Sequence, residues 1–331
     1  MGRLIDTLPG VAMSVAAVTD MLRHMWDAEA ADPGSHGFRA SQLNLILHFG
    51  LSTTPAEARE KFDTAIRFAQ KHPCRIIVLC PAKERLPAAE FEGKLFSQCY
   101  IGRHLREMCC CEALILGYSP EQSDFLENQV SIWLESDLPI YHWFHRVPAD
   151  RIAGHYLGFI KRCRKVLFDG EVEGEAYDRI DWPERSRVSD LARARSLPLR
   201  QHLGQFISGF PPEDLVDGLQ SLHFEHTRGM RRKALILMQW HRRALAGCFP
   251  KEADLDSVVF SLEQIVQENP ECCLRIAWRY KSPRKYLMIN YNRSRKSGLI
   301  RASMPGGTFE HPLHIEPLKP EVSLSEAMFF G

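Results

Sequence analysis

Three consecutive cysteines, Cys109, Cys110 and Cys111, are the residues of this sequence that most readily suggest chemistry. They lead into CEALILGY, an apolar segment typical of a strand. On a strand, Cys109 and Cys111 share a face with their Cβ atoms ~6–7 Å apart, whereas a disulfide needs ~3.5–4.5 Å. Three adjacent thiolates cannot surround one zinc ion, and the sequence has no C-x-x-C pair. The triplet therefore favours core packing and leaves a regulatory thiol open, and Cys272 and Cys273 fall under the same reasoning.

Two histidine pairs have the wrong spacing for a metal site. His142 and His145 are three residues apart, so on a strand their side chains point to opposite faces. HFEH (223–226) has neither the order nor the spacing of the helical H-E-x-x-H zinc motif, and we interpret it as structural. The aromatic residues around His142 lie at the end of a predicted parallel strand, where clefts and contact surfaces form. Tyr141, Trp143 and His145 can therefore belong either to the core or to an interface.

Compact catalytic signatures are absent from the sequence. It contains no G-x-x-x-x-G-K-[ST] loop, no G-x-G-x-x-G after a strand and no G-x-S-x-G elbow. For an α/β chain of this length, these absences argue against an enzyme. We predict no catalytic residue, no metal site and no cofactor.

Two stretches are locally basic although the whole chain carries a formal net charge of only +1. Residues 228–243 have six Lys or Arg and no acid, and residues 275–301 have nine, interleaved with aromatic side chains. Such a region can bind nucleic acid through phosphate contacts and base stacking. It can equally form solvated basic strand edges, or a positive face for an acidic protein partner. The sequence leaves these three interpretations open.

The first half of the chain alternates predicted strands and helices. Helices are predicted over residues 11–30, from Thr54 to about residue 70, from Ser119 to about residue 136, and over 148–162. Thr54 with Glu57, and Ser119 with Gln122, have the spacing of a capping box at the start of the second and third helices. Strands are predicted at 42–50, 74–80, 94–101, 111–118, 138–146 and 165–169. This alternation predicts an α/β fold with a doubly wound, mostly parallel sheet.

An acidic, Gly-containing segment at 169–186 marks the most probable boundary in the chain. Beyond it we predict short helices over 188–208, a helix over 229–247 that is apolar nearly all round, and strands near 219–226, 257–266, 272–280 and 285–292. These elements predict an α+β domain with a buried helix and antiparallel strands. The expected organisation is an α/β domain at 1–180, an α+β domain at 181–302 and a Pro-rich tail at 303–331.

Composition is that of an ordinary globular protein, with 45% hydrophobic and 25% charged residues among 331. No stretch approaches the ~20 apolar residues that span a bilayer. LPGVAMSVAAV (8–18) is faintly like a signal peptide, but Asp6 lies where positive charge is needed, so we do not expect export. Ten irregularly spaced cysteines fit a reducing cytoplasm.

Six collinear segments of the sequence resemble the OpcA family, the glucose-6-phosphate dehydrogenase assembly proteins. They are VTDMLRHMW (18–26), HPCRIIVLCP (72–81), CCCEALIL (109–116), DLPIYHWFHRVP (137–148), VSDLARARSLPLRQHLGQFI (188–207) and LHFEHTRGMRRKALILMQWHRRAL (222–245). The chain departs from the family pattern at Phe144, where a second tryptophan is usual, and at Arg193, where the family has tryptophan.

The resemblance implies a non-catalytic regulator that binds glucose-6-phosphate dehydrogenase, favours its active oligomer and so raises flux into the oxidative pentose phosphate pathway. A regulator of this kind can shift such an equilibrium only by the difference in its affinity for the two states. No membrane partner is expected, and nucleic acid binding through 275–301 or an unrecognised sugar-phosphate enzyme are the alternatives.

Two sets of residues are candidate sites under this hypothesis. The partner-interface candidates are Tyr141, Trp143, His145, Arg231 and Arg232, because aromatic and arginine side chains supply binding hot spots. Since the resemblance also implies thiol-dependent control, the redox candidates are Cys74, Cys80, Cys109, Cys110 and Cys111.

Overall fold

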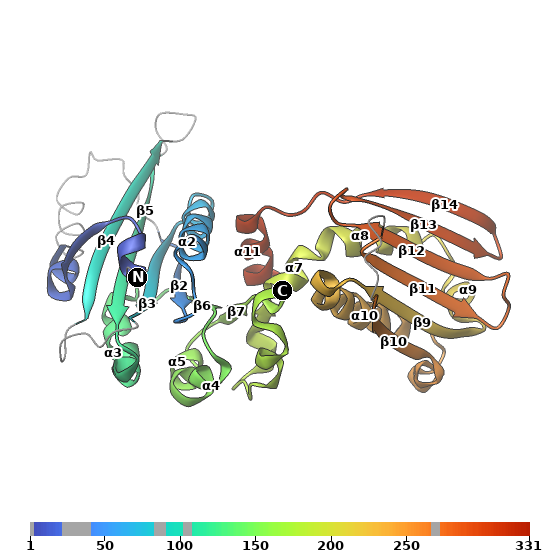
Figure 1. Ribbon diagram of the computed structural model, residues 1–331, viewed down its shortest axis with the longest axis horizontal. Helices are drawn as coiled ribbons and strands as arrows, with labels where there is room; N and C mark the ends of the chain where they lie inside the picture. The colour runs from blue at the N-terminus through green and yellow to red at the C-terminus, as the bar shows by residue number, and fades with distance from the viewer. Residues whose placement is uncertain (1–2, 22–40, 83–90, 102–107, 266–271) are drawn as a thin grey trace. The chain divides into compact units, whose positions relative to one another are not determined.

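The computed structural model describes residues 3–21, 41–82, 91–101, 108–265 and 272–331. Its backbone contacts divide the chain into two compact units (Figure 1). The first unit is Met1–Leu191 together with Pro320–Gly331, and the second is Ala192–Lys319. Each unit is built on its own sheet.

The first unit holds an eight-stranded sheet with the strand order β1-β4-β5-β3-β2-β6-β7-β8. Its strands are β1 (Val11–Ser14), β2 (Leu43–Phe49), β3 (Cys74–Pro81), β4 (Glu92–Ile101), β5 (Met108–Tyr118), β6 (Ile140–His145), β7 (Lys165–Phe168) and β8 (Val188–Asp190). All neighbours from β5 to β8 pair in parallel, whereas β1 and β4 are antiparallel additions at one edge. The predicted mostly parallel sheet is confirmed.

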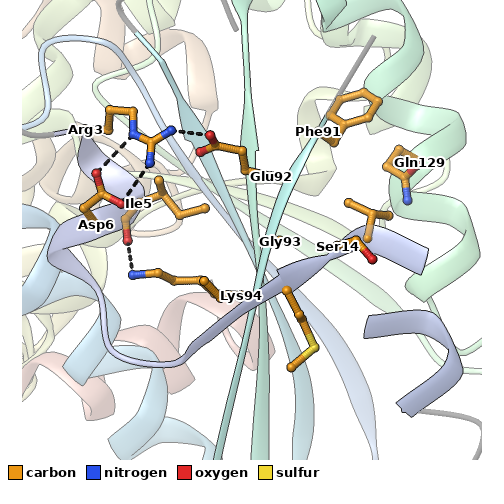
Figure 2. A pocket seen from close by; sticks show the side chains of 12 residues that line it. Arg3, Ile5, Asp6, Ser14, Phe91, Glu92, Gly93, Lys94 and Gln129 are labelled. Atoms are coloured by element: carbon orange, nitrogen blue, oxygen red, sulfur yellow. Dashed lines mark hydrogen bonds and ion pairs between the residues drawn. The ribbon is translucent and has the colours of Figure 1, made fainter. Parts of the chain in front are cut away.

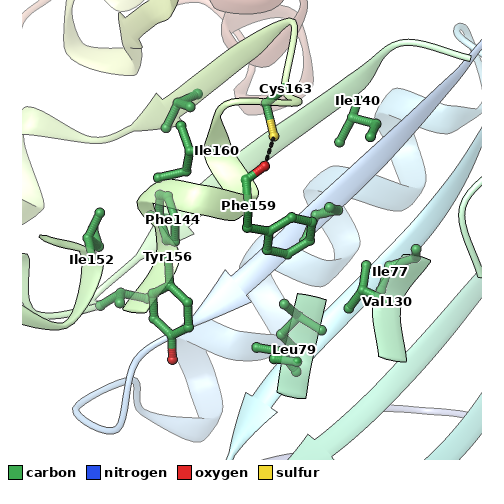
Figure 3. Close-up of a cluster of buried hydrophobic side chains, with 14 of the residues drawn as sticks. Ile77, Leu79, Val130, Ile140, Phe144, Ile152, Tyr156, Phe159, Ile160 and Cys163 are labelled. Carbon is green, nitrogen blue, oxygen red and sulfur yellow. Dashed lines mark hydrogen bonds between the residues drawn. The ribbon is translucent and has the colours of Figure 1, made fainter. Parts of the chain in front are cut away.

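Helices cover both faces of this sheet, as expected of a doubly wound fold. On one face, side chains such as Ile77 and Phe144 pack beneath α3 (Ser123–Trp133) and a helical run made of α4 (Ala149–Arg151), a π-helix (Ile152–Tyr156) and α5 (Leu157–Ile160). Figure 3 shows the rings of Phe144, Tyr156 and Phe159 in this cluster. On the other face lie α2 (Pro55–Ala69) and α11 (Pro320–Phe329), which pack against each other. The strands between the two layers are buried on both sides.

Local sequence explains where two of these helices begin. Thr54 Oγ1 accepts a hydrogen bond from the backbone N–H of Glu57, and the Glu57 carboxylate accepts one from the backbone N–H of Thr54. Before α3, the side chain of Gln122 likewise accepts a hydrogen bond from the backbone N–H of Ser119. Both helix starts were predicted from this reciprocal pattern.

The helix predicted to begin at residue 11 is wrong at its start. Residues 11–14 form β1, which pairs antiparallel with β4, and only residues 15–21 are helical within the described part of this segment. Gly10, at φ +127°, turns the chain into the strand. The strand forms because β4 offers an unpaired edge, which no helical periodicity in the sequence could reveal. Residues 22–30 lie outside the described residues.

The second unit contains a six-stranded sheet with the order β10-β9-β11-β12-β13-β14, which Figure 1 shows from β10 at the lower edge to β14 at the upper edge. Its strands are β9 (Leu219–His226), β10 (Val259–Gln264), β11 (Leu274–Tyr280), β12 (Tyr286–Asn292), β13 (Ser297–Met304) and β14 (Gly307–His314). All neighbours are antiparallel except β9 and β10, which the helix α10 (Arg231–Ala246) connects. The predicted α+β character is confirmed.

Helix α10 buries one side rather than its whole circumference. Ala234, Leu237 and Leu245 pack into the core of the second unit together with α8 (Leu197–Ile207) and α9 (Pro212–Val216), while Gln239 and Arg242 are exposed. The short helix α7 (Leu191–Arg195) precedes α8.

Residues 303–331, for which the sequence predicts a Pro-rich tail, hold regular structure. The turn after β13 passes through Gly307 at φ +123°, and β14 then pairs with β13 over its whole length. Helix α11 follows and belongs to the first unit. Pro312 within β14 is tolerated because β14 is an edge strand of the sheet.

Candidate functional site

The sheet order of the first unit defines the position where a ligand would be expected. The chain builds β2, β3 and β5 outward in one direction, then returns to β6, β7 and β8 on the other side of β2. In open α/β sheets, ligands bind outside the carboxyl ends of the strands at such a switch point. Here it lies between the ends of β2 and β6, where Gly50 follows one strand and Arg146 follows the other.

The backbone closes directly over this switch point. The N–H of Gly50 donates to the carbonyl oxygen of His145 at 2.8 Å, and Thr53 Oγ1 donates to the same oxygen at 3.4 Å. Arg146 adopts a left-handed conformation, with φ 57°. A Cβ atom on Gly50 would lie 1.7 Å from the carbonyl oxygen of Arg146. Only glycine fits there, because the segment after β2 rests on the segment after β6.

The side chain of Arg146 fills the space next to this backbone contact. Its Nε and Nη2 donate to Glu57 Oε1 at 2.9 and 2.5 Å, while its backbone N–H donates to Glu173 Oε1 at 2.7 Å. Glu57 opens helix α2, and Glu173 ends the short helix α6 (Gly170–Glu173) after β7. The ends of β2, β6 and β7 are thereby joined through one arginine.

The two carboxylates differ in protonation. Burial alone would raise the pKa of Glu57, but hydrogen bonds from Arg146 and Thr54 outweigh it and lower the pKa to about 2. Burial raises the pKa of Glu173 to about 7, only partly offset by the hydrogen bond from the Arg146 backbone, with Asp169 adding to the rise. Near neutral pH, Glu57 is therefore ionised and Glu173 titrates.

The ion pair of Glu57 and Arg146 lies at the N-terminus of α2, where an anion could otherwise bind. The N-terminus of a helix next to a parallel sheet is a ready site for phosphate, since its backbone N–H groups point outward. At α2, the Glu57 carboxylate already accepts the Thr54 N–H at 3.0 Å and is neutralised by Arg146. A phosphate there would meet a carboxylate instead of vacant donors.

A second polar group lies inside the unit, on the face covered by α3. It is a chain of hydrogen bonds that joins His142 Nε2 to His48 Nδ1 (3.1 Å), His48 Nε2 to the Tyr118 hydroxyl (2.8 Å), that hydroxyl to the Tyr156 hydroxyl (3.3 Å), Tyr156 to Ser123 Oγ (3.1 Å), and Ser123 to Arg151 (2.8 Å). We call this set the buried polar chain. It links β6, β2, β5, the π-helix, α3 and α4.

Burial keeps the histidines of this chain neutral. It lowers the pKa of His48 to about 3 and that of His142 well below its usual value, and it raises the pKa of Tyr118. General acid–base catalysis works best with a pKa near the operating pH. The buried polar chain is therefore suited to holding six elements in register rather than to moving protons.

A groove of about 690 Å³ runs along β1 and β4 at the edge of the sheet, between the N-terminal turn (Leu4–Thr7) and α3 (Figure 2). Its volume is in the range of small-molecule sites. However, Arg3 already bonds to Asp6 and Glu92, and Lys94 donates to the carbonyl oxygens of Ile5 and Leu8 at 3.0 and 3.1 Å. Because both cations have partners, the groove offers little to a sugar phosphate.

No metal centre is built from the residues that the structure describes, since they contain no group of three or more His, Cys, Asp or Glu side chains able to hold an ion. In the same residues, no helix combines the length and apolar character that crossing a lipid bilayer requires.

Comparison with known proteins finds a family model and two relatives that are similar to parts of the chain. Residues 65–180 match the family described as glucose-6-phosphate dehydrogenase subunit N-terminal domain. Two proteins provisionally named OxPP cycle protein OpcA are similar to the chain: one from Synechococcus elongatus, 26% identical over 277 residues, and one from Synechocystis, 21% identical over 182 residues. Over these residues the chain is similar to the OpcA family.

The extent of these likenesses differs. The match to the Synechococcus OpcA covers 78% of this chain and 60% of that protein, and the match to the Synechocystis OpcA covers 52% and 37%. The chain thus spans about 60% of the length of the Synechococcus OpcA. A crystal structure of glucose-6-phosphate 1-dehydrogenase from Mycobacterium avium is also similar over 87% of each chain, at 11% identity and a TM-score of 0.43.

Three of the five interface candidates are buried. Tyr141, Trp143 and His145 are 4%, 2% and 1% exposed, on the face of the sheet that α2 and α11 cover. Tyr141 packs against Phe329 of α11. Of the two interpretations that the sequence left open for this strand, the structure places the side chains in the core.

The other two candidates lie in the second unit. Arg231 and Arg232 form the first turn of α10, where Arg231 is exposed and Arg232 partly buried. They come from a different unit than Tyr141, Trp143 and His145, and the two sets remain separate candidates.

The cysteines resemble core residues where the structure describes them. Cys74, Cys80 and Cys111 are buried within β3 and β5, and burial raises the pKa of the Cys80 thiol. A buried thiol with a raised pKa is poorly reactive, because the thiolate is the reactive form. Cys109 and Cys110 lie in β5, opposite Tyr100 and Cys99 of β4, but their side chains lie outside the described residues.

The aromatic residues of the basic region 275–301 are also largely internal. Trp278, Tyr280 and Tyr291 are at most 5% exposed and belong to the core of the second unit. They cannot stack on nucleic acid bases in this conformation. The observation that suggested nucleic acid binding therefore has a structural explanation.

Sequence reasoning missed the contact of Gly50 with Arg146, the pair of Arg146 and Glu57, and the buried polar chain. One signal was available, since Glu57 was identified as a capping residue and was the only charged member of that pattern. No motif in the sequence around Arg146 indicated this contact, because Arg146 lies 89 residues from Glu57 in the chain.

Proposed function

We propose that this chain binds glucose-6-phosphate dehydrogenase and regulates it without catalysing a reaction itself. The observation that carries the proposal is the match of residues 65–180 to a family described as a glucose-6-phosphate dehydrogenase subunit domain. Because the chain spans about 60% of the Synechococcus OpcA, the proposal concerns what these residues do and not everything a longer relative does.

The closed switch point supports a regulatory rather than a catalytic role. At the position where sheets of this order bind nucleotides, the chain places the Gly50 backbone, the Arg146 side chain and the Glu57 carboxylate. These groups satisfy one another's hydrogen bonds and charges. Opening the position for a substrate would require breaking a partly buried, charge-assisted contact.

A non-catalytic partner acts through differential binding. If it binds the active arrangement of the dehydrogenase tenfold more tightly than the inactive one, it shifts that equilibrium by about 1.4 kcal/mol. The dehydrogenase must in turn show a changed dependence on its substrate when the partner is present. We propose the cytoplasm as the place of this interaction, since the ten cysteines follow no disulfide framework.

We propose Arg231 and Arg232 as contacts for an acidic surface of the dehydrogenase. They start α10 and follow Arg228, so three arginines occur within five residues. Arginine is favoured at interfaces because its planar group binds carboxylates in a bidentate manner. The same helix supplies a matched control in Arg242 and Arg243, which are exposed near its other end.

The test uses the full chain and the dehydrogenase of the same organism. Size-exclusion chromatography of the mixture should show co-elution, and the dehydrogenase assayed at sub-saturating glucose 6-phosphate should become more active when the chain is added. The double variant Arg231→Ala/Arg232→Ala should lose co-elution at least tenfold in apparent affinity, while Arg242→Ala/Arg243→Ala should not. A chain that leaves both assembly and kinetics of the dehydrogenase unchanged would refute the function, and equal binding by both double variants would refute only this placement.

A further inference from the structure

Helix α3 of the first unit has apolar residues on two of its sides. Leu126, Val130 and Trp133 are buried and pack into the core beneath the helix. Phe125 and Ile132 point away from that core and are 64% and 59% exposed. A surface helix of a globular protein normally carries polar residues outside its buried face. The packing of the first unit therefore does not explain the exposed pair.

The spacing of the exposed pair is that of a binding helix. Phe125 and Ile132 are seven residues, or nearly two turns, apart, so they share a side of α3 about 10 Å apart along its axis. Gln129, four residues after Phe125, lies between them. Apolar positions at i, i+4 and i+7 are typical anchors of a helix that binds a groove or another helix. We call Phe125, Gln129 and Ile132 the α3 stripe.

The α3 stripe adjoins the groove at the edge of the sheet. Gln129 lines this groove together with Met13, Val15 and Phe91. Figure 2 shows Gln129 and Phe91 on the side of the groove away from Arg3. The part of the groove next to α3 is thus mainly apolar, and the stripe extends it outward.

The charges around the stripe fit a protein partner better than a membrane. Helix α3 carries Asp124 and Glu127 and has no Lys or Arg. Asp124 is 2.9 Å from a ring nitrogen of His155, and Glu127 is 3.9 Å from Arg162. A helix that lies on an anionic membrane needs basic residues on its polar face. An apolar centre bordered by polar and charged groups is instead the composition of a protein–protein contact.

The position of α3 in the chain indicates which protein that is. Helix α3 lies within residues 65–180, which match the family described as a glucose-6-phosphate dehydrogenase subunit domain. Among the described residues of this range, Phe125 and Ile132 are the only large apolar side chains that are exposed. Exposed apolar surface of this kind marks an interaction site.

From these observations we infer that the α3 stripe and the adjoining groove form a docking surface of the first unit for an apolar segment of glucose-6-phosphate dehydrogenase. The inference rests on the proposed function. It adds a surface on the first unit to the arginines of α10, which belong to the second unit.

Isothermal titration calorimetry of the full chain with the dehydrogenase of the same organism is the test. The wild type should bind with a negative heat capacity change, because apolar surface is buried. The double variant Phe125→Ala/Ile132→Ala should bind about tenfold or more weakly, with a less negative heat capacity change. Both positions are exposed and alanine favours helices, so this variant should fold, which far-UV circular dichroism verifies.

Val259→Ala is the matched control, because Val259 on β10 of the second unit is 59% exposed, as Ile132 is. This variant should bind the dehydrogenase like the wild type. Phe125→Glu is a second test variant, and it should weaken binding at least as much as the double alanine variant, since it places a carboxylate in the apolar contact.

The outcomes separate the surface from the function. A wild-type chain that does not bind the dehydrogenase would overturn both. Wild-type binding with unchanged affinity in the folded double alanine variant would overturn this surface and leave the proposed function standing. Sedimentation velocity of the chain alone gives the third outcome: self-association of the wild type that the double variant loses would assign the stripe to a second copy, and that also overturns the inference.

Discussion

Gly50 and Arg146 touch through their backbones at the switch point of the first sheet, where a Cβ atom on Gly50 would lie 1.7 Å from the Arg146 carbonyl oxygen. The contact joins the segments that follow β2 and β6, which are nearly a hundred residues apart in sequence. It leaves no room for a side chain at the position where related sheets hold nucleotides. The stability of the first unit should therefore depend on this glycine.

We predict that Gly50→Ala lowers the free energy of unfolding by roughly 2–4 kcal/mol, because the two segments must separate to admit a methyl group. Urea denaturation followed by circular dichroism measures the change. Gly154→Ala is the control, since a Cβ atom there has no neighbour within 4 Å. A Gly50→Ala variant as stable as the control would show that the two segments can move apart at little cost.

Glu57→Gln should destabilise the fold at neutral pH by about 1 kcal/mol, through loss of the charge-assisted bonds from Arg146. The pKa of Glu57 falls from about 4.5 to about 2 on folding, so its contribution is present above pH 4.5 and is lost as pH falls through 2. The difference between wild type and variant should accordingly shrink between pH 4.5 and pH 2. Urea midpoints at pH 7 and pH 3 give the comparison, and a difference independent of pH would contradict the assigned ion pair.

Glu173→Gln should have the opposite pH dependence. Its pKa rises from about 4.5 to about 7 on folding, so the folded state holds the proton more tightly and stability is lost as pH rises from 4.5 through 7. Glutamine keeps the acceptor for the Arg146 N–H but cannot ionise. The free energy of unfolding of the variant should equal that of the wild type near pH 4.5 and exceed it by about 1–3 kcal/mol at pH 8. The same urea denaturation experiment measures both. Parallel pH profiles would show that Glu173 is not held in its neutral form.

Tyr118→Phe should lower the free energy of unfolding by about 1–3 kcal/mol. It removes the hydroxyl that bonds to His48 and Tyr156, and so leaves buried polar atoms without a hydrogen bond. Tyr156→Phe removes the next hydroxyl of the same chain. If the two act in one network, the double variant should lose less than the sum of the single changes. Strict additivity in this double-mutant cycle would argue against a cooperative buried polar chain.

The buried histidines should destabilise the chain in mild acid, whereas Glu173 acts in the opposite direction over the same pH range. Burial lowers the pKa of His48 to about 3 and that of His145 and His241 to about 4, from an ordinary value of 6.5. Unfolding lets each histidine take up a proton, so the free energy of unfolding should fall as pH drops below 6.5. Replacing His48 by glutamine should flatten this fall, although it lowers stability at pH 7. Since Glu173 acts oppositely, the measurement is made on the Glu173→Gln variant, and unfolding midpoints that stay constant there from pH 7 to pH 5 would contradict neutral burial of the histidines.

The sequence by itself determined most of the elements and the resemblance to the OpcA family. The reciprocal capping patterns at Thr54 and Ser119 placed two helix starts, and the apolar runs at 42–50, 74–80 and 138–146 placed the central strands. These signals are local, because capping and periodicity depend on residues within one or two turns. The collinear motifs then sufficed to indicate the OpcA family.

Only the tertiary structure decided which side chains meet. A strand that is buried on both faces has apolar residues at successive positions, without the alternation that would mark one face as exposed. The sequence therefore could not show whether Tyr141, Trp143 and His145 face the core or a surface. Whether Arg146 reaches Glu57, and whether Gln129 and β1 line one groove, depends on strand order and register between distant segments. Those are set by the packing of whole sheets, which no short stretch of sequence encodes.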